Sequence, residues 1–247
     1  MQKSITETSR FNLQVFREVY EQEIDKKFVE NLGKNLIENK VDVLFLRVLA
    51  TQQNYLHFIQ TLPYQIIYAD TLVYYQNIVA KEVQIVFRNP NIIIKAATIK
   101  DTNSINKLVE EIFANYTNHH TSNPILPKLD ILNGYKEWAL GYIEAEELCQ
   151  FAFIATLDNK KVGFLTCNIA NNVCEIILNG VLPAYQNKGI YTDLVRFVKN
   201  FCIDKGVETI KISTQVQNYA VQKVWVKENF YLFNAYITLH INSLLNN

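Results

Sequence analysis

The chain has 247 residues, of which 49% are apolar and 19% charged, and this composition predicts a globular protein with a buried core. Lysine plus arginine and aspartate plus glutamate balance at 24 each, so charge gives no reason to expect nucleic acid or an anionic membrane as partner. No apolar run reaches the roughly 18 residues that a membrane helix needs, and the start MQKSITETSR lacks the apolar core of a secretory signal. We therefore expect a soluble, cytoplasmic protein.

The chain has four cysteines, none in a Cys-x-x-Cys pair, and three of them sit in apolar runs. Free cysteine is among the most buried residue types, whereas metal and redox sites favour paired spacing. We therefore expect buried thiols in a reduced protein, with no disulfide and no bound metal.

The N-terminal part is predicted to mix helices and strands, from helical spacing in some runs and β-rich apolar composition in others. In chain order these are a helix at residues 12–39, a strand at 41–48, a helix at 52–62, a strand at 64–79 and a strand within 80–91. Asp70-Thr71 is predicted to break the long strand, and Asn-Pro-Asn after it predicts a linker. We place a domain boundary there, which gives domains 1–89 and 90–247.

The C-terminal part is predicted to have the order β-α-α-β-β-β-α-β-α-β, with Asp101-Thr102 as a helix cap and Gly206 as a helix end. The elements are a strand at 92–99, a helix at 105–116, a polar loop at 118–130, a helix at 132–147, strands at 150–157, 161–170 and 173–182, a helix at 193–206, a strand at 207–214, a helix at 218–229 and a strand at 230–241. Residues 41–75 share the predicted strand–helix–strand order of 207–241, and Asn-Tyr opens the helix in both. A chance likeness and a partial copy of the C-terminal part are the alternatives.

The stretch PAYQNKGIY, residues 183–191, lies between a predicted strand and a predicted helix. Pro183 ends the strand, and Gly189 allows a tight turn with positive φ. The first amides of a helix have no intrahelical partner, so the N–H groups of residues 187–191 could converge on a pyrophosphate, with Lys188 adding charge. An ordinary strand-to-helix turn is the alternative, because the stretch is neither a Walker loop nor a Rossmann fingerprint.

A Q-x-x-G turn after a three-stranded meander resembles the GCN5-related N-acetyltransferase (GNAT) superfamily over residues 92–242. The resemblance implies an α+β protein with a mixed β-sheet, a partial N-terminal GNAT-like lobe, and acetyl-CoA as co-substrate without a metal. Tyr191 departs from it, because the superfamily usually has Gly or Ala there. The cofactor-binding residues that it implies are Leu178, Gly180, Val181, Gln186, Asn187, Lys188, Gly189, Ile190, Tyr191, Asn218 and Trp225.

Asn218 opens the last predicted helix, where the superfamily has an asparagine that helps to hold the cofactor; a plain helix cap is the alternative. Seven residues on, many members have a tyrosine that protonates the leaving thiolate, but this chain has Trp225. An indole N–H donates and is not acidic. Tyr191, Tyr219 or Tyr231 could replace the acid, or solvent could assist, and the sequence leaves this open.

The polar loop at residues 115–124 is expected to lie over the acceptor side of such a fold. His119 could take the proton of the attacking amine, because an imidazole titrates near neutral pH. Glu175, on a predicted strand, is the rival base, and exposed side chains without a role are the alternative for both. The candidate catalytic residues are His119, Glu175, Tyr191 and Tyr219, and the candidate substrate-binding residues are Tyr116, His119, His120 and Asn123.

The TQ-x-x-N run, Trp225 and the histidine loop resemble most the sugar-nucleotide branch, typified by dTDP-fucosamine acetyltransferase. This implies transfer of an acetyl group from acetyl-CoA to a primary amine, on a nucleotide-linked amino-deoxy sugar. The alternatives are another amine, such as an amino acid, an antibiotic or a protein, and a non-catalytic acyl-CoA-binding module. A homodimer is left open, and neither nucleic acid nor membrane is an expected partner.

Overall fold

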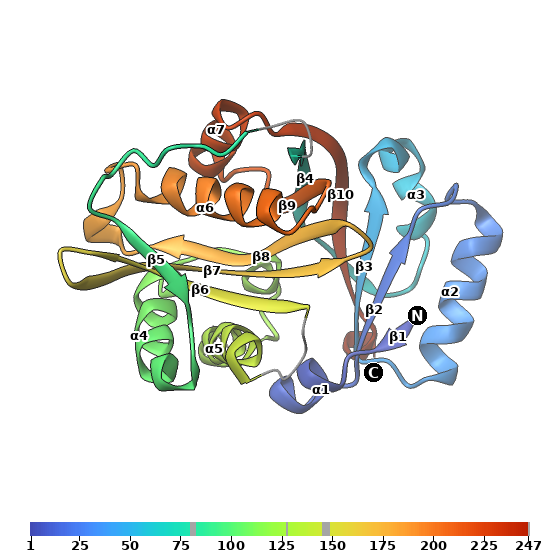
Figure 1. The fold of residues 1–247 in the computed structure, drawn as a ribbon. Coiled ribbons are helices and arrows are strands. Elements are labelled where there is room, and N and C mark those ends of the chain that lie inside the picture. The colour runs from blue at the N-terminus through green and yellow to red at the C-terminus, as the bar shows by residue number, and fades with distance from the viewer. Residues whose placement is uncertain (80–82, 127, 145–148, 247) are drawn as a thin grey trace. The chain divides into compact units, whose positions relative to one another are not determined.

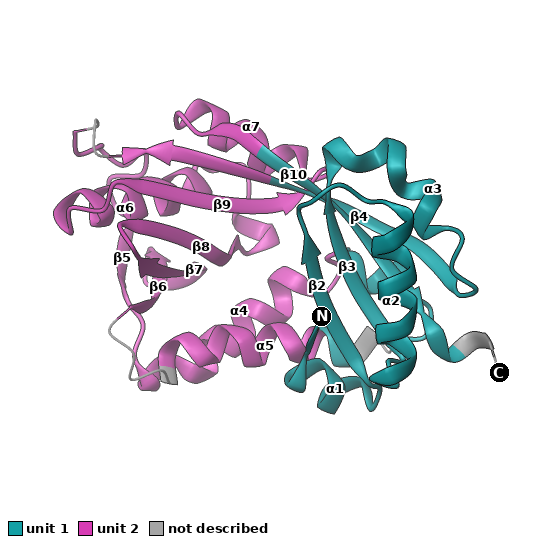
Figure 2. Cartoon of the chain, turned by 90° about the vertical axis from the view of Figure 1, so that its right-hand side faces the viewer, with its two compact units in different colours: residues 1–73, 117–131, 234–247 teal, residues 74–116, 132–233 magenta. Residues whose placement is uncertain are grey.

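The computed structural model describes residues 1–79, 83–126, 128–144 and 149–246. The chain divides into two compact units, coloured separately in Figure 2. Unit 1 comprises residues 1–73, 117–131 and 234–247, and unit 2 comprises residues 74–116 and 132–233. This division into units does not test the domain boundary expected near residue 89, which stays a prediction.

Unit 1 is built on strands in the order β1-β2-β3-β10-β4. Its elements are β1 (Gln2–Lys3), α1 (Ile5–Phe11), β2 (Val15–Tyr20), α2 (Lys26–Glu38), β3 (Val43–Leu49), α3 (Leu56–Ile59), the first part of β4 (Gln65–Ile78) and most of β10 (Tyr231–Asn242). Leu32 and Leu36 of α2 pack in one apolar cluster with Leu44 and Leu46 of β3 and Leu239 of β10. This cluster gives unit 1 a core of its own.

The predicted single helix over residues 12–39 is wrong. Val15–Tyr20 is strand β2, and α2 begins only after Asp25, whose carboxylate accepts a hydrogen bond from the Phe28 N–H at 2.7 Å. β2 pairs in parallel with β3, and α2 is the crossover between them. The apolar residues of β2 imitate helical spacing, but its β-branched and aromatic side chains and its pairing with β3 make it a strand.

Unit 2 is built on strands in the order β4-β9-β8-β7-β6-β5. Its elements are the end of β4, β5 (Ile93–Ala96), α4 (Thr102–Phe113), most of α5 (Lys128–Glu144), β6 (Gln150–Leu157), β7 (Lys160–Ala170), β8 (Val173–Val181), α6 (Ile190–Asp204), β9 (Thr209–Gln215), α7 (Tyr219–Lys227) and the start of β10. Helix α6 covers one face of the β5–β8 strands, and α4 and α5 cover the other (Figure 1). The predicted β-α-α-β-β-β-α-β-α-β order and the mixed-sheet α+β class are confirmed.

Two further predictions about local structure are wrong. Asp70-Thr71 does not break β4, which runs without interruption from Gln65 to Ile78. Residues 83–91 do not form a strand, because their backbone groups bond to side chains of α6, as described below. Residues 80–82 of that predicted strand and residues 145–147 of the predicted helix lie outside the described residues.

Three of the four cysteines, Cys167, Cys174 and Cys202, are buried as expected, and Cys149 is exposed. Within the part of the chain that the structure describes, no helix is long and apolar enough to cross a bilayer.

Candidate functional site

Strands β8 and β9 separate in the middle of unit 2. They pair in parallel from Val173 with Thr209 to Ile176 with Ile212, and between described residues the ladder goes no further, although β8 continues to Val181. A β-bulge on β8 accompanies the separation, and there the Thr166 hydroxyl accepts a hydrogen bond from the Leu178 N–H at 3.1 Å. The β9 side of residues 177–181 therefore presents strand backbone outside the ladder.

The predicted residues on this edge have different surroundings. Leu178 is buried in the apolar cluster under α4. Gly180 lies against α4 so closely that a Cβ there would come within 2.5 Å of Cγ2 of Ile112. The Gln186 side-chain amide donates to the Val181 carbonyl at 3.4 Å, which ties the edge to the loop that follows it.

The loop before α6 has the backbone that the sequence predicted. Asn187 has φ of 61° and Gly189 has φ of 81°, and Gly189 is the N-cap of α6. Among the described residues, no carbonyl or side chain accepts a hydrogen bond from the N–H groups of residues 187–191. A row of unpaired amides at the positive end of a helix is suited to an anion such as a phosphate.

Residues 83–91 run beside α6 (Figure 1) and are fixed by its polar side chains. The Ile85 N–H and C=O both bond to the Asn200 side chain at 2.8 Å, and Arg196 donates to the Val86 carbonyl at 2.9 Å. At the start of the helix, the Asn89 side chain donates to the Lys188 carbonyl at 3.0 Å. This contact joins residues 99 apart in the chain, so the sequence, which predicted a strand and linker here, gave no sign of it.

Asp193 is the buried anchor of this segment. Its carboxylate, 0% exposed, accepts hydrogen bonds from the Arg88 N–H at 2.6 Å, the Asn89 N–H at 3.1 Å and the Asn89 side chain at 2.7 Å. These bonds place Arg88 beside the loop, where a Cβ on Gly189 would lie 3.6 Å from Nε of Arg88. A cationic side chain thus lies next to the unpaired amides.

We expect Asp193→Ala to lower the free energy of unfolding by about 3 kcal/mol, because it leaves donors of residues 88 and 89 without an acceptor. Asp204→Ala is the matched control on the same helix. Asp204 is exposed and accepts only from the Gln84 side chain in the described structure, so its loss should cost less than about 1 kcal/mol. Urea unfolding of both variants measures the difference, and equal costs would contradict the anchoring role.

The predicted residues of α6 and α7 meet at Tyr191. The Trp225 indole N–H donates to the Tyr191 hydroxyl at 2.9 Å, and that hydroxyl donates to Oδ1 of Asn179 at 2.8 Å. Asn218 is the N-cap residue of α7, but its side chain makes no capping bond and donates instead to the Thr214 hydroxyl at 3.0 Å. The Asn218 side chain therefore does not itself cap the helix.

The other tyrosines and the strand carboxylate are placed differently. Tyr219 is 65% exposed. Tyr116 donates its hydroxyl to the Gln215 side chain. Glu175 is exposed on the part of β8 that still pairs with β9, opposite Lys211. That position precedes the separation of the strands, so Glu175 does not lie on the free edge.

The predicted histidine loop is not a solvated loop. His119–Ser122 is a 3₁₀ turn of unit 1 capped by the Asn118 side chain, and His119 is 7% exposed. Nδ1 of His119 lies 2.9 Å from Nε2 of His240, and the Asn123 side chain contacts Nδ1 of His240 at 3.2 Å. The structure therefore brings His119 and Asn123 together, but in a buried polar cluster.

The remaining members of this cluster are charged. His120 lies 2.8 Å from the Glu7 carboxylate, which also accepts from the Arg17 guanidinium at 2.7 Å. Burial and the neighbouring His120 hold the pKa of His119 well below its usual range, and burial lowers the pKa of His240 to about 3. Both rings are neutral at pH 7, and a base with so low a pKa is a weak one.

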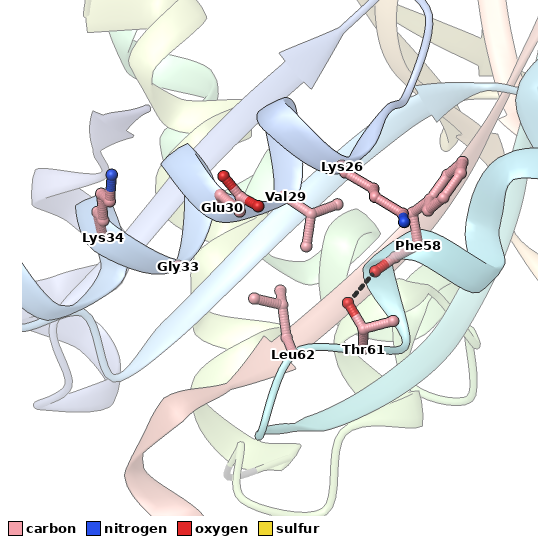
Figure 3. A pocket seen from close by; sticks show the side chains of 8 residues that line it. All are labelled: Lys26, Val29, Glu30, Gly33, Lys34, Phe58, Thr61 and Leu62. Atoms are coloured by element: carbon pink, nitrogen blue, oxygen red, sulfur yellow. Dashed lines mark hydrogen bonds between the residues drawn. The ribbon is translucent and has the colours of Figure 1, made fainter.

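Away from the loop before α6, the described residues form no metal cluster but do leave a hollow in unit 1. Among the described residues, no group of three or more His, Cys, Asp or Glu side chains could hold a metal ion. A hollow of about 330 Å³ lies between α2 and the region of α3 in unit 1 (Figure 3). It is lined by Lys26, Val29, Glu30, Gly33, Lys34, Phe58, Thr61 and Leu62, none of which the sequence predicted as a site residue.

The geometry of unit 2 agrees with comparisons to known proteins. Residues 109–230 match the model of the acetyltransferase (GNAT) family. A search of curated protein sequences gave no match. The fold is therefore GNAT-like, and the matched segment is just under half of the chain.

Three solved structures illustrate the likeness. A conserved protein of unknown function from Staphylococcus epidermidis has 14% identity and a TM-score of 0.63, with 91% of this chain and 83% of that chain covered. A GCN5-related N-acetyltransferase from Sphaerobacter thermophilus has 12% identity and a TM-score of 0.63, over 87% and 66%. A GCN5-related glucosamine N-acetyltransferase region of a fungal multi-domain β-N-acetylglucosaminidase has 10% identity and a TM-score of 0.60, over 87% and 27%. At these identities the likeness is one of fold.

Proposed function

We propose that the chain is an acetyl-CoA-dependent N-acetyltransferase that acts on a primary amine. The observation that carries the proposal is the separation of β8 from β9 directly before a loop of unpaired amides. An extended pantetheine arm can pair with strand backbone at residues 177–181, in the manner of an added strand. The amides of residues 187–191 then lie where a pyrophosphate needs donors.

The residues present suit coenzyme A as the co-substrate, which supplies the activated acetyl thioester. Position 189 favours glycine because its φ is 81°. A larger residue there would strain the backbone that presents the loop amides. Lys188 within the loop and Arg88 beside Gly189 add positive charge, although the motif has Gln186 rather than a cation in its first position. Such charges stabilise a bound phosphate by charge-assisted hydrogen bonds.

For the acceptor, we propose a nucleotide-linked amino-deoxy sugar. The resemblance of the TQ-x-x-N run and Trp225 to the sugar-nucleotide branch supports it, and a glucosamine N-acetyltransferase region shares the fold. His119 and Glu175 remain the proposed bases. The buried contacts of His119 and the paired position of Glu175 give neither residue an advantage, so the two must be compared by His119→Gln and Glu175→Gln.

A thiol-release assay with acetyl-CoA tests the proposal. The acceptors should include nucleotide-linked amino-deoxy sugars, free glucosamine, amino acids, an aminoglycoside and a peptide N-terminus. We expect release above the rate of hydrolysis with an amino sugar, together with saturable binding of coenzyme A in calorimetry.

The two measurements separate the competing functions. Binding of coenzyme A without release for any amine would favour a non-catalytic acyl-CoA-binding module. Release with an amino acid or a peptide alone would retain the enzyme and overturn the sugar. Absence of binding would overturn the proposal as a whole.

A further inference from the structure

The Tyr191 hydroxyl lies between the donor of one element and the acceptor of another. Tyr191 is in the first turn of α6, Trp225 is on α7, and Asn179 is on β8. Asn179 belongs to residues 177–181, the part of β8 that has left the ladder with β9. The hydroxyl is thus bound to a side chain of the strand edge on which the pantetheine arm is proposed to lie.

The direction of the Tyr191 proton follows from its partners. An indole N–H can only donate, so in the bond from Trp225 the phenol oxygen is the acceptor. The phenol proton is then free to go to Oδ1 of Asn179. Trp225 is 1% exposed and packs edge-on against Tyr75, with ring centroids 5.3 Å apart, so its N–H is fixed in place. Trp225 and Asn179 together orient the Tyr191 hydroxyl proton toward the edge of β8.

The other tyrosines considered as acids have no such arrangement. Tyr219 is 65% exposed and Tyr231 is 47% exposed, and the Tyr231 hydroxyl accepts a hydrogen bond from Gln76 at 2.7 Å. Burial raises the pKa of Tyr191 above its ordinary value, while the bond from Trp225 acts to lower it. Tyr191 therefore keeps its proton at neutral pH, and the phenolate formed when it gives the proton away still has the Trp225 donor.

We propose that Tyr191 donates the proton that the departing sulfur needs and that Trp225 is the positioning residue that orients it. The inference rests on the proposed acetyl transfer. In that step the amine nitrogen bonds to the acetyl carbon, the carbon–sulfur bond breaks, and its electron pair leaves on sulfur. The Tyr191 proton passes to sulfur, and the proton lost by the amine returns to the phenolate through water. Trp225 thus occupies the position at which many superfamily members have the acid, and its indole N–H orients the proposed acid, Tyr191 of α6.

The test compares Tyr191→Phe with Tyr219→Phe and Trp225→Phe with Trp138→Phe. Trp138 is 50% exposed on α5 and is the matched tryptophan outside the site. General acid catalysis contributes about 100-fold or more, so Tyr191→Phe should lower kcat by about 100-fold with little change in KM. Trp225→Phe should lower kcat by about tenfold, since it removes one hydrogen bond to the phenol.

A second readout does not depend on turnover. Ultraviolet titration of bound coenzyme A, with the desulfo-coenzyme A complex as baseline, reports the pKa of the bound thiol. Loss of a donor to the thiolate should raise that pKa by about one unit in Tyr191→Phe, and a merely structural role would not. Trp225→Phe, which retains the phenol, should raise it less and serves if Tyr191→Phe does not fold.

The outcomes are distinct. A large loss in Tyr219→Phe, or an unchanged kcat and thiol pKa in Tyr191→Phe and Trp225→Phe, would overturn this inference and leave the transferase intact. A wild-type protein that binds no coenzyme A would overturn both.

Discussion

Replacing Gly189 by valine is expected to weaken binding of coenzyme A by about 100-fold. Gly189 has φ of 81°, a conformation that costs a β-branched residue about 1–2 kcal/mol or more, and a side chain there would point at Arg88, whose Cδ lies 3.5 Å from the added Cβ. The amides on either side would turn away from a common point. Loss of two charge-assisted hydrogen bonds at about 1.5 kcal/mol each already accounts for the factor of about 100. Calorimetric titration with coenzyme A measures it.

Gly206→Val is the matched control for this variant. Gly206 has φ of 68° just after the other end of α6, and a Cβ there would meet nothing within 4 Å. Both variants should lose similar stability from backbone strain in urea unfolding, because both force a branched side chain into the left-handed region. Only Gly189→Val should lose affinity. Equal losses of affinity would mean that the loop holds no phosphate.

The sequence predicted the parts of unit 2 whose signals are local. Pro183, Gly189 and the start of α6 are encoded within a few neighbouring residues, and their backbone is as expected. The start of α7 at Asn218 was also predicted from neighbouring residues, because helix starts have short sequence signals. The turns of the meander also carry a local signal, because Asp158-Asn159 and Asn171-Asn172 are typical hairpin-turn pairs and all four residues have positive φ.

The features that were missed depend on residues far apart in the chain. His119 and His240, which contact one another, are 121 residues apart, so spacing gave no sign that the histidine loop is buried. Arg88 and Asp193 are separated by 105 residues, and the apolar run before Arg88 therefore looked like a strand. The Asn179 side chain was not predicted as part of the site, although Asn179 lies between Leu178 and Gly180 on the strand edge. Only the fold places it against Tyr191.

Acid is expected to destabilise unit 1 through its buried histidines. A histidine whose pKa is lower in the folded state than in the unfolded state binds its proton only after unfolding, so stability is complete above about pH 6.5 and falls as the pH falls. Burial lowers the pKa of His240 to about 3, so this loss continues down to that pH. Burial opposes ionisation of Glu7, but the bonds from Arg17 and His120 outweigh it and lower the pKa of Glu7. Loss of the Glu7 bonds therefore adds to the effect as the pH falls below about 4.5, the ordinary pKa of a glutamate.

The charges that face His240 come from several elements and mostly oppose its protonation. They are His120, Arg17 and Arg47, against the single carboxylate of Glu7. At about pH 5, His240 alone should cost about 2 kcal/mol relative to about pH 7.5, from its difference in pKa between the two states. Urea unfolding at the two pH values measures this loss.

His240→Gln should retain hydrogen-bonding partners for His119 and Asn123 while removing one titrating group, since glutamine offers a donor and an acceptor. Its loss of stability between the two pH values should be smaller than that of the wild type by about 2 kcal/mol, whatever its stability at neutral pH. His57→Gln is the matched control, because His57 is exposed in the same unit, and it should follow the wild type. If His240→Gln lost as much stability as the wild type, the loss between these two pH values would have to arise from the other histidines of the cluster.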